Sequence, residues 1–316
     1  MRWWLGRRHD RAPGDIPFQV RPGRAADLPA LFELWRSEVR EGRRDSLPVE
    51  PHVQGMLAHF DWGALSRVVE DGPSTLAGAV VVTSRWSPEG VVARIDPAVA
   101  SSDTPLLRDL VQWGLQLSRA AGAVAAQAWV GPGQAGALAS LGLEMVRPWW
   151  RMDRTLSGGL PKPVPVDGYE LSDASRVPKG SWAQMHNRSF ADHWRFSPRS
   201  EEELMMGKSP ALCLMALTAT SGEPAAVTLC QLETYIEDAR PQPVGLVSSV
   251  GTVPEHRRRG LASWLVAEGL LRLRTAGARH ATLYVDGFNE TRAFDAYRKL
   301  GFELAFEAEV WEASFK

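Results

Sequence analysis

Apolar residues in the C-terminal part of the chain follow first the spacing of a strand and then that of a helix. Val244–Val253 is rich in β-branched residues and predicts a strand, which the charged segment Pro254–Arg259 ends. Apolar or small residues then recur at helical spacing up to Gly277, at positions 262, 265, 266, 269, 270 and 273. A short strand over Thr282–Val285 and a second helix over Thr291–Leu300 follow. This part therefore predicts a strand–helix–strand–helix unit.

The N-terminal part repeats this order. Gly90–Ile95 predicts a strand, Asp96–Thr104 a loop, Leu106–Ala120 a helix and Ala123–Val130 a second strand. The glycine that ends the first helix recurs after 155 residues and the glycine that ends the second recurs after 159, as the pairs Gly122 and Gly277, and Gly142 and Gly301. We therefore expect two copies of one unit.

The segments before these units also match. A strand over Phe18–Arg21 or Tyr169–Leu171 precedes a helix, and in the second copy an antiparallel pair over Cys213–Thr218 and Ala225–Glu233 leads into the central strand. This order predicts the α+β (mixed α/β) class, with a mostly antiparallel mixed sheet flanked by helices in each copy. The expected organisation is an N-terminal tail (1–15), a first domain (16–157), a Pro-rich linker (158–167) and a second domain (168–316).

Charge and composition narrow the classes of protein. The 36 basic and 37 acidic residues give a net charge of −1, without the basic excess of nucleic-acid binders, so we expect no nucleic-acid partner. Cys213 and Cys230 lie in apolar runs, which argues against a disulfide framework and a cysteine-rich metal site. No apolar run approaches the roughly 18 residues of a membrane span, and the charged and proline residues after Leu5 lead us to expect no secretory signal. We expect a cytoplasmic protein without a membrane partner or a metal.

The segment Arg257–Ala262 is the most informative one chemically. It follows a predicted strand and opens a predicted helix, where the first backbone N–H groups have no partner within the helix and favour an anion. Gly260 and Ala262 are small enough to let a ligand approach, and three arginines add charge. These features predict a pyrophosphate site. The nucleotide motifs G-x-x-x-x-G-K-[ST] and G-x-G-x-x-G are absent from the sequence.

Thr252–Ala262 fits the pattern V-x-P-x-x-R-x-x-G-x-A with Thr in place of the first Val, and resembles the acyl-CoA loop of the GNAT superfamily of N-acetyltransferases. Asn289, Tyr297 and the segments Leu283–Val285 and Leu300–Phe302 resemble the later strand and helix of that superfamily. The doubled architecture, the length and the segment Met185–Ala191 look most like the tandem-domain mycothiol synthase-like subfamily.

The resemblance implies that acetyl-CoA serves as acyl donor, with its pantetheine arm beside Val247–Thr252. A backbone N–H near Val250 would polarise the thioester carbonyl while an amine attacks directly. Tyr297 would be the general acid for the leaving thiolate. The implied cofactor-binding residues are Val250, Thr252, Arg257, Arg258, Arg259, Gly260, Leu261, Ala262 and Asn289.

The sequence departs from the family pattern at two points. Asn289 and Tyr297 are eight residues apart, whereas seven is usual in the family. Leu246 stands where mycothiol synthase has a glutamate early in the central strand, so the amine needs another base. Glu233 and His193 are the candidates, and each is also compatible with an ordinary surface residue.

The acceptor side is expected at the loop between the first two helices of the second copy. Its aromatic residues offer an apolar wall or belong to the core, and its charged residues could hold a cationic amine. The candidate residues are Asp192, His193, Trp194 and Phe196. Ser200 and Glu203 form a predicted capping box for the helix that follows.

The first copy lacks the site residues. The offset of 155 places Ser102–Pro105 opposite Arg257–Gly260, so a carboxylate at Asp103 replaces a cation and Pro105 removes an N–H donor. The offset of 159 places Leu138 opposite Tyr297. A structural or acceptor-shaping role is therefore expected for the first copy.

The sequence thus favours transfer of an acetyl group to a primary amine of a small molecule by the second domain. The alternatives are acetylation of a sugar-linked cysteinyl amine, as in mycothiol synthase, and a non-catalytic acyl-CoA-binding protein. A monomer and a homodimer are both compatible with the sequence.

Overall fold

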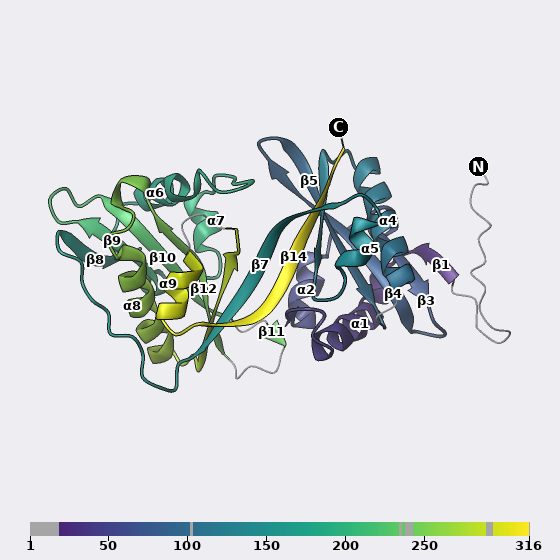
Figure 1. The fold of residues 1–316 in the computed structure, drawn as a ribbon, viewed down its shortest axis with the longest axis horizontal. Coiled ribbons are helices and arrows are strands. Elements are labelled where there is room, and N and C mark those ends of the chain that lie inside the picture. Colours follow the sequence, from purple (N-terminus) through teal and green to yellow (C-terminus); the bar gives the residue numbers. More distant parts are fainter. Residues whose placement is uncertain (1–18, 102–103, 234–235, 238–242, 289–292, 316) are drawn as a thin grey trace.

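The computed structural model describes residues 19–101, 104–233, 236–237, 243–288 and 293–315. One 12-stranded sheet runs through the molecule in the order β1-β3-β4-β5-β6-β14-β7-β13-β12-β10-β9-β8 (Figure 1). Most strand pairs are antiparallel, and helices cover both faces, which confirms the mixed α/β architecture. We call residues 16–157 the first half and residues 168–316 the second half. The expected N-terminal tail lies outside the described residues.

In the part that the structure describes, the first half contributes a meander of strands and five α-helices. Its β4 and β5 form a long antiparallel hairpin, and β5 and β6 pair in parallel only over Val92–Ile95. Its strands are β1 (Gln19–Pro22), β2 (Leu47–Pro48), β3 (Ser66–Glu70), β4 (Leu76–Ser87), β5 (Gly90–Val99), β6 (Ala125–Val130) and β7 (Glu144–Thr155). Its helices are η1 (Ala25–Asp27), α1 (Leu28–Arg40), α2 (Glu50–Met56), α3 (Trp62–Leu65), α4 (Thr104–Ala120) and α5 (Ala135–Ala139).

The second half repeats this plan. Its β12 and β13 pair in parallel only over Val244–Val247, as β5 and β6 do in the first half. Its strands are β8 (Tyr169–Asp173), β9 (Cys213–Thr218), β10 (Pro224–Glu233), β11 (Ile236–Glu237), β12 (Val244–Thr252), β13 (His280–Asp286) and β14 (Glu303–Ser314). Its helices are α6 (Ser181–Phe190), α7 (Glu201–Met205), η2 (Pro210–Leu212), η3 (Pro254–His256), α8 (Leu261–Thr275) and α9 (Ala293–Lys299).

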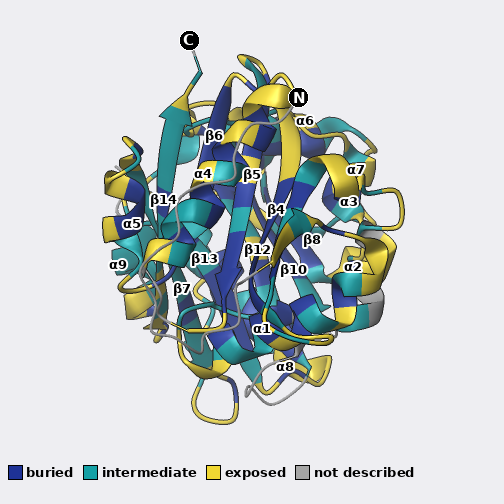
Figure 2. Cartoon of the chain, turned by 90° about the vertical axis from the view of Figure 1, so that its right-hand side faces the viewer, coloured by how far each residue is buried: buried dark blue, intermediate teal, exposed yellow. Residues whose placement is uncertain are grey.

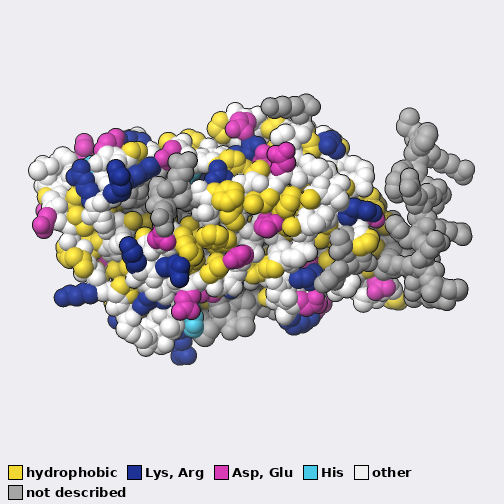
Figure 3. Space-filling model, viewed as in Figure 1, with side chains coloured by type: hydrophobic (Ala, Val, Ile, Leu, Met, Phe, Trp, Pro, Cys, Tyr) yellow, Lys and Arg dark blue, Asp and Glu magenta, His cyan; other side chains and the backbone are white. Residues whose placement is uncertain are grey.

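The last strands of the two halves are exchanged in the sheet. β14 belongs to the second half but pairs with β6 of the first, and β7 belongs to the first half but pairs with β13 of the second. These two strands also pair with each other across the middle of the molecule (Figure 1). Apolar side chains gather over this middle region (Figure 3). The two halves therefore share one sheet, and the boundaries 157 and 168 remain predictions.

Buried side chains form separate clusters on the two faces of the sheet, so that the strands are dark blue at the centre (Figure 2). In the first half α1 covers one face and α4 the other. In the second half α6 and α7 lie on one face and α8 on the other. Cys213 contacts the α6 cluster and Cys230 the α8 cluster, and burial raises the pKa of Cys213 to about 11. Both cysteines are buried core residues.

The structure corrects one expectation about the first half. The strand β5 continues to Val99, and α4 already begins at Thr104. The connection is therefore limited to residues 100–103, shorter than the expected loop and shorter than residues 253–260 in the second half. Pro105 lies in the first turn of α4, so the offset of 155 does not hold in this loop and Pro105 is not the counterpart of Gly260.

Among the described residues, no helix is long and apolar enough to cross a membrane. Within the same ranges, no group of three or more His, Cys, Asp or Glu side chains could hold a metal ion.

Candidate functional site

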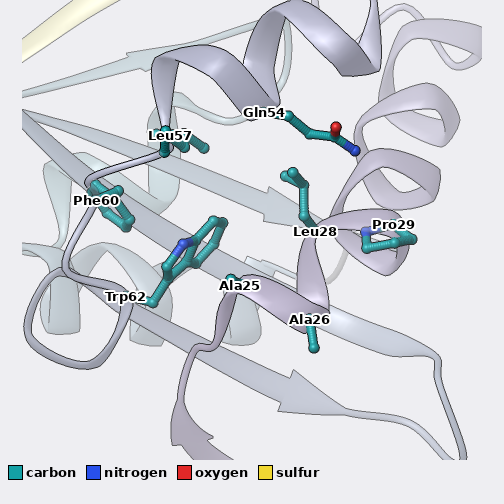
Figure 4. A pocket seen from close by; sticks show the side chains of 9 residues that line it. Ala25, Ala26, Leu28, Pro29, Gln54, Leu57, Phe60 and Trp62 are labelled. Atoms are coloured by element: carbon teal, nitrogen blue, oxygen red, sulfur yellow. The ribbon is translucent and has the colours of Figure 1, made fainter.

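A cleft of about 1920 Å³ lies on one face of the sheet and is lined by both halves of the chain. In the second half its wall includes β12, the start of α8, the end of β13 and α9. In the first half its wall includes the segment after α1 and the cleft-facing side chains of β4, β5 and β6. A second hollow of about 470 Å³, lined by Leu28, Leu57, Phe60 and Trp62 among others, contains no ionisable side chain (Figure 4). It therefore offers no acid–base chemistry.

The outer edge of β12 opens into the large cleft. Pairing with β13 ends at Val247, and among the described residues the later part of β12 has no partner strand on that side. The register with β10 shifts here, so that Ser248 forms a bulge and its hydroxyl donates to the Leu229 carbonyl at 3.2 Å. Val250 and Thr252 line the cleft beyond this bulge. Their strand edge is thus available to an extended ligand.

The loop after β12 ends at the N-terminus of α8. Gly260 is the N-cap with a φ of 90°, a left-handed conformation that glycine adopts without a Cβ clash. Gly260, Leu261 and Ala262 line the cleft, so the first backbone N–H groups of α8 lie close to the solvent inside the cleft. Since α8 extends to Thr275, its dipole adds positive potential at this end. The predicted anion site therefore has the expected local geometry.

Two of the three arginines in this loop have partners within the protein. The Arg257 guanidinium donates to the carbonyls of Thr252 (3.1 Å) and Ser189 (3.0 Å) and to both oxygens of Asp192 (2.7 and 3.1 Å). Arg259 donates to the Tyr169 hydroxyl at 3.1 Å. Arg257 thus ties the loop to the end of α6, while Arg258 lines the cleft.

Tyr297 on α9 lines the same cleft, and its ring packs edge-on against Phe302 with centroids 6.2 Å apart. Burial raises the pKa of the Tyr297 hydroxyl, which keeps it protonated at neutral pH. The Phe302 N–H donates to the Tyr297 carbonyl just as the Leu143 N–H donates to the Leu138 carbonyl. This repeated hydrogen bond confirms that Leu138, a fully buried residue, is the counterpart of Tyr297. Asn289 lies outside the described residues.

The loop over residues 191–200 crosses from the second half to the first. His193, Trp194 and Phe196 line the cleft, whereas the Asp192 carboxylate is held by Arg257. Arg195 in this loop donates to Glu312 on β14 at 2.7 and 3.0 Å and also pairs with Glu89 between β4 and β5. The capping box of Ser200 and Glu203 is confirmed.

The two candidate bases lie in different places. Glu233 pairs with Val244, at the closed end of β12, and is not among the residues that line the cleft. His193 lines the cleft with an exposed side chain, and partial loss of solvent lowers the pKa of its imidazole from the ordinary value, although Asp192 opposes this shift. A lowered pKa favours the neutral imidazole, which is able to accept a proton.

Sequence reasoning assigned no role to His186. It is 3% exposed, lines the floor of the cleft on α6, and its Nε2 lies 3.4 Å from the Ser249 hydroxyl on β12. Burial lowers the pKa of His186 to about 4. Its position on the buried face of an amphipathic helix was the only signal in the sequence.

The corresponding strand edge in the first half is closed. The Ala100 N–H donates to Ala77 as the Val253 N–H donates to Ala225, so Val99 is the counterpart of Thr252. The Val99 N–H donates to Glu38 at 2.9 Å, and its carbonyl accepts from Arg43 at 3.0 Å. Glu38 also pairs with Arg43 (3.0 Å) and with Arg44 (2.9 Å), and Arg44 pairs with Asp96 (2.7 Å). Side chains thus bind both the N–H and the carbonyl of Val99. In β12 Arg257 binds the Thr252 carbonyl, but no described side chain binds the Thr252 N–H.

Most of the second half matches a known protein family. Residues 181–305 match the family described as acetyltransferase (GNAT) domain. The second half of the chain therefore carries a GNAT acetyltransferase domain.

Curated relatives are named mycothiol acetyltransferase. The protein from Thermobispora bispora is 32% identical over 178 residues, which cover 54% of this chain and 59% of the relative. The protein from Nocardia farcinica is 27% identical over 260 residues, covering 80% of this chain and 84% of the relative. The alignment with the Kytococcus sedentarius protein covers 57% of that relative. The chain therefore spans less than two thirds of the length of the Thermobispora bispora and Kytococcus sedentarius proteins.

Solved structures share the fold of the whole chain. A GCN5-related N-acetyltransferase from Sphaerobacter thermophilus has a TM-score of 0.76 at 22% identity, over 94% of this chain and 95% of that one. A tandem GNAT protein from the clavulanic acid biosynthesis pathway has a TM-score of 0.66 at 19% identity, over 94% and 98%. At these identities the likeness establishes the doubled fold and nothing about the substrate.

Proposed function

We propose that this protein transfers an acetyl group from acetyl-CoA to a primary amine of a small molecule, using the second half of the chain. The observation that carries this proposal is the open edge of β12, which leads to the N-terminus of α8 and lies in one cleft with Tyr297. The first half lacks an open edge at the matching strand.

In the proposed reaction the pantetheine arm hydrogen-bonds to the edge of β12 between Val247 and Thr252. The pyrophosphate binds the amides at Gly260, Leu261 and Ala262. The amine forms its bond to the thioester carbonyl carbon, and the Val250 N–H stabilises the oxyanion that develops. The carbon–sulfur bond then breaks, and the leaving thiolate takes a proton from the Tyr297 hydroxyl, which its environment keeps protonated.

The attacking amine must lose a proton, and we assign this step to His193. Its imidazole lines the cleft in a neutral form, whereas Glu233 lies at the closed end of β12. We infer that the pair of Asp192 and Arg257 positions the loop over residues 191–200, and that His193 acts as the base. Trp194 and Phe196 would contribute apolar wall to the acceptor site. Asn289 remains a candidate contact of the cofactor.

Acetylation of a sugar-linked cysteinyl amine is the second candidate, because curated relatives are named mycothiol acetyltransferase. Leu246 lines the cleft where that subfamily presents a glutamate, so the step that deprotonates the amine would differ. This departure makes the more general acceptor our first choice.

Calorimetric titration of acetyl-CoA tests the proposed site. The wild type should bind one acetyl-CoA per chain, and Gly260→Glu should abolish binding because it strains the loop and places an anion at the helix start. Gly277→Glu is a matched control, since Gly277 also has a positive φ (101°) and lies at the other end of α8. Failure of the wild type to bind would remove the basis of the proposal.

Tyr297→Phe separates an enzyme from a binding protein. Loss of the general acid should lower kcat by roughly 100-fold or more, with the affinity for acetyl-CoA unchanged. The readout is release of free thiol with an accepted amine, beside the calorimetric titration. A variant with full turnover would show that Tyr297 is not the acid.

A further inference from the structure

Two arginines on the first-half wall of the cleft have side chains exposed to it. Arg85 projects from β4 and Arg94 from β5, and both line the cleft. The Arg94 guanidinium lies 4.8 Å from the ring centroid of Trp129 on β6. Stacking on this ring fixes its orientation while its N–H groups remain available for a ligand.

No ion pair joins either arginine to a carboxylate among the described residues. The nearby carboxylates already have partners, because Asp96 pairs with Arg44 and Glu312 pairs with Arg195. Arg85 and Arg94 are exposed to the cleft, but its walls partly shield both guanidinium groups from bulk water, which lowers the pKa of each. Asp96 opposes this shift at Arg94. At Arg85 the positive charges of Arg195 and Arg199 add to it, and Glu312 opposes it. This wall therefore has cationic groups whose charge the protein itself does not balance.

Aromatic side chains lie between these arginines and the open edge of β12. Trp129 on β6, Trp149 on β7 and Phe306 on β14 line the cleft, and the two tryptophan rings meet edge-on at 5.4 Å. From β6 to β13 the sheet has three steps, through β14 and β7, or about 14 Å at the usual spacing of strands. A ligand that reaches both ends of this floor is longer than a free amino acid, since an extended residue spans about 3.3–3.6 Å.

We propose that the acceptor is an extended molecule with its amine beside β12 and β13 and an anionic group, carboxylate or phosphate, at its other end, bound by Arg94 and Arg85. This inference rests on the proposed acetyl transfer and adds the chemical class of the acceptor. The planar guanidinium of Arg94 offers paired N–H donors to two oxygens of either anion. The aromatic floor would contact the middle of the ligand.

The test compares acceptors that differ only in the distal charge. We would measure calorimetric binding to the CoA-loaded protein, and acetylation by thiol release, for the pentapeptide glycyl-alanyl-phenylalanyl-alanyl-alanine, about 16–18 Å long when extended, and its C-terminal amide. Glycyl-phosphotyrosine amide and glycyl-tyrosine amide form the phosphate arm. The charged member of at least one pair should bind roughly 10- to 100-fold more tightly, as expected for hydrogen bonds to a charged group.

Variants then test whether the preference for the charged acceptor comes from the arginines on the first-half wall of the cleft. Arg94→Gln should reduce it to less than about 3-fold, and Arg94→Lys should retain part of it, because charge without the planar fork binds an anion less well. Arg119→Gln is the matched control, since Arg119 also stacks on an aromatic ring, that of Phe315 at 4.5 Å, outside the cleft.

The outcomes separate this inference from the proposed function. Equal behaviour of acid and amide in both pairs, including no binding of any peptide, would overturn the inference. A preference that survives in Arg94→Gln would also overturn the assignment. Anion-dependent binding in a protein that fails to bind acetyl-CoA would support the anion site and reject the acetyl transfer.

Discussion

The two halves of the sheet contain the same opening between parallel strands and use it in opposite ways. In the second half β12 separates from β13 after Val247, and its edge lines the cleft. In the first half β5 separates from β6 after Ile95, and Glu38 and Arg43 bind the N–H and carbonyl of Val99. The fold thus supplies the opening, and a few side chains decide whether a ligand can enter it.

The helix beside each opening makes this difference. Helix α1 places the Glu38 carboxylate on the edge of β5, whereas α6 places the neutral His186 imidazole near Ser249 on β12. The connections after the strands differ as well, since residues 100–103 are too few to form a loop like residues 253–260. The same arrangement of strands can therefore present an open edge or a closed one, depending on one charged side chain and the length of the loop that follows.

Glu38→Ala should have the largest effect, because it removes the carboxylate that closes the edge of β5. It removes the shared partner of Arg43 and Arg44 and leaves two cations near a buried backbone N–H, which should cost about 3–5 kcal/mol of unfolding free energy. Denaturant unfolding measures this loss, with Glu33→Ala on the exposed face of α1 as control. Acetyl-CoA stoichiometry should remain at one per chain. A loss below about 1 kcal/mol, or a second bound acetyl-CoA, would contradict the account of the closed edge.

The neutral histidine of the second half should make stability depend on pH. His186 has a pKa of about 4 in the folded protein against 6.5 when unfolded, so the unfolded chain takes up the proton first as pH falls. The contribution of the neutral imidazole to the free energy of unfolding is fully present above pH 6.5. It falls by about 3 kcal/mol as the pH is lowered to 4. His186→Gln should remove that part of the pH dependence in denaturant titrations, and His59→Gln should not. Equal slopes in wild type and His186→Gln would refute the assignment.

The smallest effect is expected for Asp192, which helps to position the loop over residues 191–200 and does not itself line the cleft. Asp192 is 56% exposed in its pair with Arg257, and exposed pairs contribute about 0–1 kcal/mol. Asp192→Asn should therefore weaken acetyl-CoA binding by less than about 5-fold in calorimetry. A loss of two orders of magnitude would mean that Asp192 has a direct role in the site.

Local signals made the second half readable from the sequence. The β-branched residues of Val244–Val253 and the apolar or small residues at helical spacing after Gly260 gave a strand and a helix. The glycines at 122, 142, 277 and 301 gave the repetition, because each has a positive φ that other residues rarely adopt. The cleft was not predictable in the same way. Arg94, Trp129 and His186 line one cleft from elements that are far apart in the chain, and no local spacing encodes that arrangement. The counterparts of Arg257–Gly260 were misplaced because a constant offset of 155 was assumed across a connection of different length.

The exchange of β7 and β14 has a consequence for how the chain comes apart. A protease that cuts between residues 158 and 167 would leave two fragments, each holding a central strand whose two neighbours both lie in the other fragment. Such fragments should co-elute on gel filtration under native conditions and part only in denaturant. Deleting β14 would remove a partner strand from both β6 and β7 in the half of the molecule that is synthesised first, so this part of the sheet is complete only after β14 has been synthesised.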